Sequence, residues 1–247
     1  MTDTNPLAES LRLLWDGLPE REKGPRRSLT LAQIVTAAVE LADDAGVDAL
    51  SMRALAQKLG VGTMSLYRYV PSKTELLNLM LDSVVGPTPS REQARHQGWR
   101  TFLTTTAHEA RRMYLAHPWT LQANWSRPVL GPNSLADLEL FMSGVRDLPL
   151  SDREKMNLTT SLDSYIHGAV RQELLYTNSA ALTGISDEEF WRHQGATLAR
   201  AMESGQYPTT ASVAEDAFDA DWEENFTFGL ELLLDGTATL IGRQGSH

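Results

Sequence analysis

The sequence predicts an all-α protein with a small N-terminal helix-turn-helix domain and a larger helical domain. Residues 30–85 read as three short helices followed by a fourth, and the start and stop signals of these helices agree with one another. After the segment 86–89, Gly-Pro-Thr-Pro, the chain changes to long amphipathic stretches separated by prolines. We therefore expect an N-terminal extension at 1–28, a helix-turn-helix domain at 29–86 and a second helical domain at 91–242.

The N-terminal extension is expected to hold a short helix and a charged arm. The helix would run from Pro6 to Asp16 and dock on the body or on a partner subunit through an apolar face of Leu7, Leu11, Leu14 and Trp15. Residues 21–28 combine four basic side chains with a glycine and a proline. This segment suits either an arm that enters a DNA minor groove or a nonspecific tail.

The first helix of the helix-turn-helix is marked at both ends. Thr30 and Gln33 form a capping box, and Gly46 ends the helix. Its apolar positions recur at helical spacing and are Ile34, Ala37, Ala38, Leu41 and Ala45. This is the supporting helix of the motif.

The second and third helices are joined by a glycine turn. Ser51 caps the second helix, whose apolar face is Met52, Leu55, Ala56 and Leu59. Gly60 supplies the positive dihedral that ends it, and Gly62 lets the next helix start at a sharp angle. The third helix, 63–69, is too short to be a core helix. Leu66 and Val70 anchor it inward, so its other residues are expected to face outward.

The remaining helices follow from capping and proline signals. Ser72 and Glu75 form a second capping box that opens a helix with the apolar residues Leu76, Leu77, Leu79, Met80 and Val84. In the second domain, prolines separate helices expected near 91–116, 132–147, 152–177, 187–204 and 214–241. The stretch 117–132 is the least regular.

The segment 45–73, AGVDALSMRALAQKLGVGTMSLYRYVPSK, resembles the DNA-binding domain of the TetR (tetracycline-repressor-like) regulators. Residues 226–236, FTFGLELLLDG, are similar to the last helix of the tetracycline-repressor-type ligand domain. The resemblance implies a ligand-responsive regulator, a repressor that a hydrophobic small molecule releases from a palindromic operator. It also implies a homodimer, double-stranded DNA and a small-molecule effector as partners, and no cofactor.

Eight residues are candidates for DNA contact: Arg53, Thr63, Met64, Ser65, Tyr67, Arg68, Tyr69 and Lys73. Met64 and Arg68 suit base reading, and Arg53 suits a guanine edge, although an exposed arginine on a solvated face is the alternative. The hydroxyls and Lys73 suit phosphate contacts, and Tyr67 resembles the family's phosphate-contacting tyrosine. Tyr69 would either contact DNA or cover the hydrophobic seam.

The charge distribution agrees with a DNA reader near the N-terminus. The whole chain has a net charge of −10, but residues 21–73 carry eight basic and five acidic groups, which makes that segment +3. The acidic remainder would repel nucleic acid from the other faces.

The second domain is expected to hold either a plain core or an effector cavity. It has more bulky aromatic residues than a small bundle needs, with a few polar groups among them. The candidate ligand contacts are Phe102, His108, Met113, Trp119, Trp125, Asn157, Tyr165 and Trp191. The tetracycline repressor's histidine positions fall near Pro89 and within 121–124, where this chain has no histidine, so no tetracycline–magnesium effector is expected.

Dimerisation would place two readers about 34 to 36 Å apart, in successive major grooves. Two helices have apolar stripes that could form a four-helix bundle with their symmetry mates, or face only the domain's own interior. These stripes are Asp163, Ile166, His167, Val170, Leu174 and Leu175 in one helix and Phe226, Leu230, Leu233, Leu234, Ala238 and Ile241 in the other.

Several other classes of protein are disfavoured. There is no cysteine, which excludes disulfides and thiolate metal sites. There is no run of 18 apolar residues and no signal-peptide pattern, so we expect a soluble cytoplasmic protein without a membrane partner. No metalloprotease, nucleophile-elbow or phosphate-loop motif occurs, so we expect no enzyme and no metal site. The alternative is a helical protein-interaction adaptor without regulated DNA binding.

Overall fold

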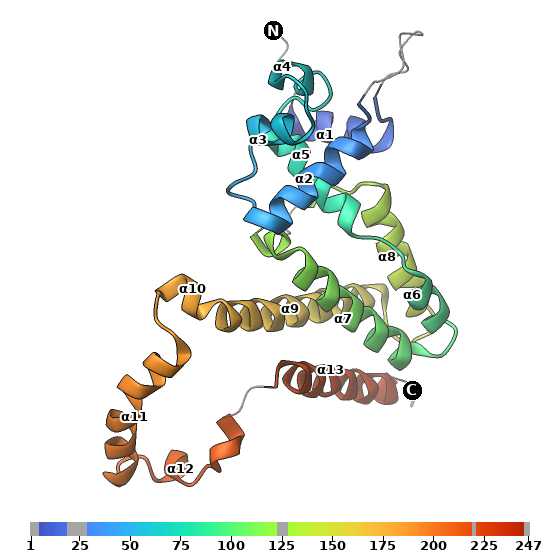
Figure 1. Cartoon of the computed structure of the whole chain (residues 1–247). Coiled ribbons are helices and arrows are strands. Elements are labelled where there is room, and N and C mark those ends of the chain that lie inside the picture. The colour runs from blue at the N-terminus through green and yellow to red at the C-terminus, as the bar shows by residue number, and fades with distance from the viewer. Residues whose placement is uncertain (1–4, 19–28, 123–127, 219–220, 245–247) are drawn as a thin grey trace.

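The computed structural model describes residues 5–18, 29–122, 128–218 and 221–244, and helices are the only regular secondary structure in these ranges. Figure 1 shows α1 to α5 gathered at one end, α7, α9 and α13 in the body, and α10 to α12 projecting from it. The helices are α1 (Pro6–Trp15), α2 (Leu31–Ala45), α3 (Met52–Lys58), α4 (Thr63–Leu66), α5 (Lys73–Val84), α6 (Pro89–Ala94), α7 (Trp99–Ala116), η1 (Pro118–Gln122), α8 (Pro132–Gly144), α9 (Asp152–Thr177), α10 (Ser179–Thr183), α11 (Asp187–Glu203), α12 (Pro208–Ala211), η2 (Glu215–Phe218) and α13 (Trp222–Gln244).

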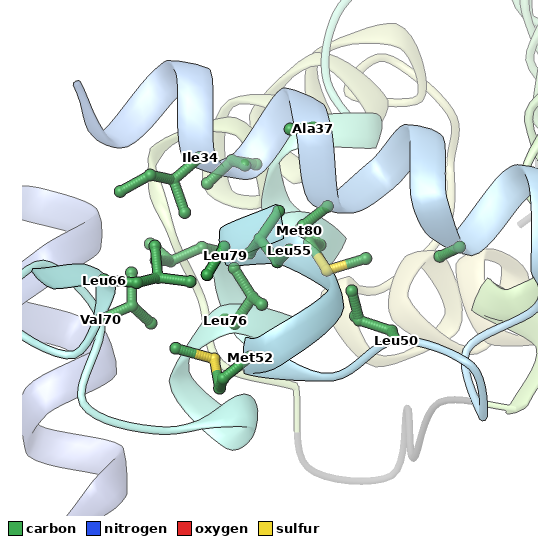
Figure 2. Packing of buried hydrophobic residues seen from close by; sticks show 14 of the residues in the cluster. Ile34, Ala37, Leu50, Met52, Leu55, Leu66, Val70, Leu76, Leu79 and Met80 are labelled. Carbon is green, nitrogen blue, oxygen red and sulfur yellow. The ribbon is translucent and has the colours of Figure 1, made fainter. Parts of the chain in front are cut away.

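The helix-turn-helix domain is built on one hydrophobic core. Figure 2 shows the core side chains of α2, α3 and α5 converging with those that anchor α4. Ile34, Leu66 and Val70 are fully buried, as their spacing predicts. Both caps at the start of this domain are present: Thr30 with Gln33 forms a capping box, and Ser51 accepts from the Ala54 N–H. At α5 the capping box is replaced by a Ser72 hydroxyl that accepts from the Thr74 N–H and donates to Glu75.

Helix α1 docks on α5 through a face that matches the expected one only in part: Leu14 packs against the helix-turn-helix core as expected. Leu13 is only 1% exposed in the helix-turn-helix core, whereas Leu7 and Trp15 are about half exposed. Ser10 accepts from Asn78 Nδ2 on α5 at 2.8 Å. The Trp15 indole donates to the carbonyl of Leu130 at 3.1 Å, so the extension joins both domains. The charged arm at 21–28 lies outside the described residues.

The second domain departs from the expected helices at two places. The helix expected at 91–116 is two helices, because Gly98 adopts a φ of 103° between α6 and α7. The helix expected at 214–241 begins only at Trp222, and α12 and η2 precede it. Helix α9 begins and ends where its signals predict, with a Ser151–Glu154 capping box. No helix in the described ranges is long and apolar enough to cross a membrane.

Two aspartates of the helix-turn-helix domain hold the second domain. Asp82 near the end of α5 is buried and accepts from the N–H groups of Asn133 and Ser134 at the start of α8. Asp43 of α2 accepts from the Trp119 indole, and His117 Nδ1 also lies 2.8 Å from its Oδ1. The orientation of α5 is therefore tied to α8, and α2 is tied to η1 and to the residue that ends α7.

Candidate nucleic-acid interface and ligand cavity

The turn between α3 and α4 needs only one of its two glycines. Gly60 has a φ of 67°, a left-handed conformation that side chains disfavour. Gly62 has an ordinary φ of −71°, and an added Cβ would find its nearest neighbour, Ser65 Oγ, at 3.8 Å. The fold therefore requires glycine at 60 and leaves room for a side chain at 62.

Helix α4 presents one face to the core and the other to solvent. It has four residues, and backbone hydrogen bonds continue the helical turns through Tyr69 and Val70. Leu66 and Val70 are buried, and between them Tyr67 and Arg68 point outward while Tyr69 is half-buried. Met64 is 75% exposed and Tyr67 is 41% exposed, with Ser65 and Arg68 beside them. The structure thus forms a compact exposed face from the residues expected to contact DNA.

The cations of this region differ in how they are engaged. Arg53 and Arg68 are exposed, and neither has an acidic partner within 4.0 Å among the described residues. Lys58, on α3, is instead paired with Glu40 of α2 at 2.9 Å. Two guanidinium groups are therefore available beside α4 for phosphates or base edges.

Three other candidates are partly engaged in the fold. Lys73 donates to the carbonyl of Val47 at 2.8 Å, which fixes its stem near the start of α5 and leaves further N–H donors. Tyr69 is half-buried against the domain core, so it covers the hydrophobic seam. Thr63 is half-buried at the start of α4.

A cavity of about 360 Å³ lies where the helix-turn-helix domain meets the second domain. It is lined by α6 to α9, by the end of α5 and by the segment before α8: Val84, Val85, Gly86, Thr88, Arg91, Glu109, Ala110, Met113, Tyr114, Pro128, Leu130, Ser134, Asp137, Leu138 and Asp163. Its volume falls in the lower range of small-molecule sites. Because Val84 at the end of α5 and Val85 after it line the cavity, a ligand here would contact the helix-turn-helix domain directly.

Polar groups stand among the apolar walls. Arg91 donates to Thr106 Oγ1 and to Asp137, and it is almost completely buried. Tyr114 donates to Asp163 Oδ1 at 3.0 Å. Burial, with the carboxylate of Asp163, raises the pKa of Tyr114 far above its ordinary value, so this hydroxyl remains a donor.

Of the seven expected ligand contacts within the described residues, Met113 alone lines this cavity. Phe102 is buried in the second core, and Trp119 is buried in the helix-turn-helix core. His108 stacks edge-on against Phe226, and Trp191 is half exposed on the projecting α11. Asn157 and Tyr165 line grooves between α9 and α13, and Trp125 lies outside the described residues. The prediction selected bulky aromatic residues, but the apolar part of the cavity wall is mainly aliphatic, so aromatic content did not locate the cavity.

The α9 and α13 stripes proposed for dimerisation are partly interior. Ile166 and Val170 of α9, with Phe226, Leu230 and Leu234 of α13, are buried in the domain's own core. The opposite face of α13 is apolar and exposed, with Phe228 at 67% and Leu232 at 61%. Several of the expected residues therefore face inward, but Asp163 and Leu175 are exposed, and Phe228 and Leu232 are exposed outside the expected set.

Comparison with family profiles identifies both parts of the chain. Residues 34–80 match the profile described as bacterial regulatory proteins, tetR family, and residues 92–241 match the tetracyclin repressor-like C-terminal domain. The first match covers most of α2 to α5, and the second includes the cavity residues from Glu109 to Asp163 and the α9–α13 pair.

Individual relatives agree with these profiles. The HTH-type transcriptional repressor DrrR1 of Streptomyces coeruleorubidus is 43% identical over 96% of this chain and 88% of that protein. The tetracycline repressor protein class A from transposon 1721, in Escherichia coli, is 26% identical over 83% of this chain and 88% of that protein. The Streptomyces coelicolor protein ActR in complex with (S)-DNPA has a TM-score of 0.66 at 26% identity, over 86% of this chain and 98% of that one. The chain belongs to the TetR family of DNA-binding transcriptional regulators.

Proposed function

We propose that this protein is a homodimeric transcriptional repressor that leaves a palindromic operator when a small molecule fills the cavity between α5 and α9. The observation that carries the proposal is the position of the cavity, which shares the end of α5 with the DNA-reading domain. The exposed face of α4 supplies the other half of the function. ActR, a relative of similar fold, has been solved with actinorhodin, which supports a small organic molecule as effector.

In this proposal α4 reads the major groove and its neighbours hold the backbone. Met64 and Arg68 contact base edges, and Arg53 adds a guanidinium from the first turn of α3. The hydroxyls of Thr63, Ser65 and Tyr67 contact phosphates. Lys73 does so too, through the ammonium N–H groups that are not bonded to the carbonyl of Val47. Tyr69 acts by supporting the seam beneath α4.

The proposed dimer forms through the outer faces of α9 and α13. Grooves between these helices are lined by small residues, among them Ser164, Gly168 and Gly229, which permit close helix approach. Phe228 and Leu232 would fill the corresponding surface of a second copy. Phe228→Asp is expected to give monomers in sedimentation measurements and to weaken operator binding.

The proposed effector acts on the joint between the domains. Ser134 and Leu130 line the cavity, while Ser134 also donates to Asp82 and the Leu130 carbonyl accepts from Trp15. A ligand that moves either residue displaces a contact that orients α5 or α1. That displacement changes the spacing of the two readers in the dimer.

The test is selection of bound sequences from a random duplex pool, followed by titration of the best sequence over a range of salt concentrations. We expect an enriched palindrome and a steep salt slope. Lys73→Ala should weaken all sequences and reduce the slope, whereas Arg68→Ala should also relax base preference, each costing about 1 to 3 kcal/mol. Arg192→Ala, on the exposed α11, is the matched control. Absence of enrichment at low salt would overturn the proposal in favour of a protein-interaction adaptor.

A further inference from the structure

The lining of the cavity is unequally charged. Among its described residues it holds three carboxylates, those of Glu109, Asp137 and Asp163, and a single cation, Arg91. Arg91 is already bonded to Asp137, so this pair is neutral. Glu109 and Asp163 therefore have no second cation in the described lining; Asp163 is exposed to solvent, whereas the side chain of Glu109 is only 12% exposed.

Glu109 is satisfied by neutral donors. Its side chain is 12% exposed, and its two oxygens accept from the hydroxyls of Thr88 and Ser90. Arg112 reaches it only at 3.5 Å, from a side chain that is 70% exposed to solvent and therefore screened. Apart from Arg91, which is bonded to Asp137, no described cation lines the cavity that this carboxylate faces.

Asp163 stands on α9 and is exposed to solvent at the rim of the cavity. Tyr114 donates to its Oδ1, and this hydroxyl is the only described hydrogen-bond donor to the carboxylate. The remaining oxygen, Oδ2, has no described donor within the protein. Asp163 thus has acceptor capacity left for a ligand.

We propose that the effector is an amphipathic cation, with an apolar body against the aliphatic walls and a protonated amine between Glu109 and Asp163. The inference rests on the proposed effector function of this cavity and adds the chemical class of ligand. Desolvating a carboxylate is costly, and a cation brought into the same cavity offsets that cost. An anion of the same shape would meet two uncompensated negative charges.

The apolar part of the ligand is set by the walls. Val84 and Val85 come from the end of α5, Ala110 and Met113 from α7, and Leu138 from α8. These groups stand on three helices around the carboxylates, so a ligand that bonds Glu109 also presses on α5. The charge of the amine sets the orientation of the ligand in the cavity. The apolar body of the ligand supplies contact area with α5.

The experiment uses three probes with the same ring system and different charge: 9-(aminomethyl)anthracene, 9-anthracenemethanol and 9-anthracenecarboxylate. Their binding to the full-length protein without DNA is measured by fluorescence titration and by calorimetry. The variants are Glu109→Gln and Asp163→Asn, which keep the shape and one acceptor oxygen while removing one charge. Glu139→Gln, an exposed residue of α8, is the matched control. Ala110→Leu, which fills part of the cavity, locates the binding.

We expect the amine to bind at least tenfold more tightly than the alcohol, and the carboxylate to bind least. Glu109→Gln and Asp163→Asn should each reduce the preference for the amine over the alcohol severalfold, whereas Glu139→Gln should leave it unchanged. If the alcohol binds as tightly as the amine and Ala110→Leu weakens both, the cavity is an effector site but the cationic class is wrong. If none of the three binds, both the cationic class and the cavity as effector site are wrong, while operator selection still tests DNA binding separately.

Discussion

Asp82 caps a helix that belongs to another domain, and this allows a quantitative test of the joint. The N-cap residue of α8 is Gly131, which has no side chain, and α8 starts with Pro132. Asp82 supplies the missing cap from α5, accepting from the Ser134 N–H at 2.9 Å and hydroxyl at 2.7 Å. Loss of a cap costs about 1 kcal/mol, and loss of a partly buried negative charge at a helix N-terminus costs up to about 2 kcal/mol. We expect Asp82→Ala to lower the free energy of unfolding by about 2 to 3 kcal/mol.

Gly131 makes the test specific. A Cβ at this position would overlap the Asp82 carboxylate, far inside van der Waals contact, and would expel it. Gly131→Ala should therefore cost about as much as Asp82→Ala, although its backbone angles suit alanine. In the Asp82→Ala background the same change should cost less than about 1 kcal/mol, because no carboxylate remains to be expelled.

The assay is urea unfolding of the two single variants, the double variant and the parent at one protein concentration, since a dimer's stability depends on concentration. Asp44→Asn, at an exposed position of α2, is the control for removal of an aspartate charge. If the loss of unfolding free energy in the double variant equals the sum of the losses in Asp82→Ala and Gly131→Ala to within about 0.5 kcal/mol, the two residues act independently and the proposed cap is refuted. Strong non-additivity would establish that Gly131 is required for the carboxylate of Asp82.

Three further outcomes follow from the packing. Gly60→Ala should lower the free energy of unfolding by about 1 to 2 kcal/mol, measured by urea unfolding, because residue 60 has a positive φ. Gly62→Ala should leave the free energy of unfolding unchanged and weaken operator binding, measured by DNA titration. Gly144→Ala would place a Cβ against the Phe102 ring and should cost about 1 to 3 kcal/mol of overpacking; unchanged urea unfolding would contradict this. Leu13→Ala should cost about 2 to 5 kcal/mol by opening a cavity in the helix-turn-helix core, and a midpoint equal to that of the parent would show that α1 is not part of that core.

The predictable parts of this fold are those that local physics determines. Thr30 with Gln33, Ser51 and Gly60 act within a few residues of themselves, so their positions in the sequence give the helix ends. The same holds for Leu66 and Val70, whose spacing fixes which face of α4 is exposed. The outward face proposed for DNA contact follows from those two residues.

The less predictable parts depend on contacts between distant segments. Trp119 was predicted to contact the ligand because it is a bulky aromatic residue of the second domain. Instead, its indole donates to Asp43 of α2, and its ring packs on the helix-turn-helix core. Asp82 has no partner close to it in the chain, and its role appears only when α8 is placed beside α5. Likewise, no local pattern shows that Glu109 and Asp163 share a cavity with Arg91.

The contact between Ser134 and Asp82 suggests how occupancy of the cavity reaches the reader. Ser134 lines the cavity, and its hydroxyl donates to Asp82. A ligand that accepts a hydrogen bond from this hydroxyl therefore competes with Asp82, the residue that caps α8. A ligand shifts an equilibrium only by the difference in its affinity for the two states, and this competition supplies such a difference. Asp82 stands on the helix whose Leu76 shares the buried core with Leu66 of α4. If the contact between Asp82 and α8 is weakened, α5 can rotate, and α4 would move with it because the two helices share one core. The spacing between the two helix-turn-helix domains of a dimer would then change without unfolding of either domain.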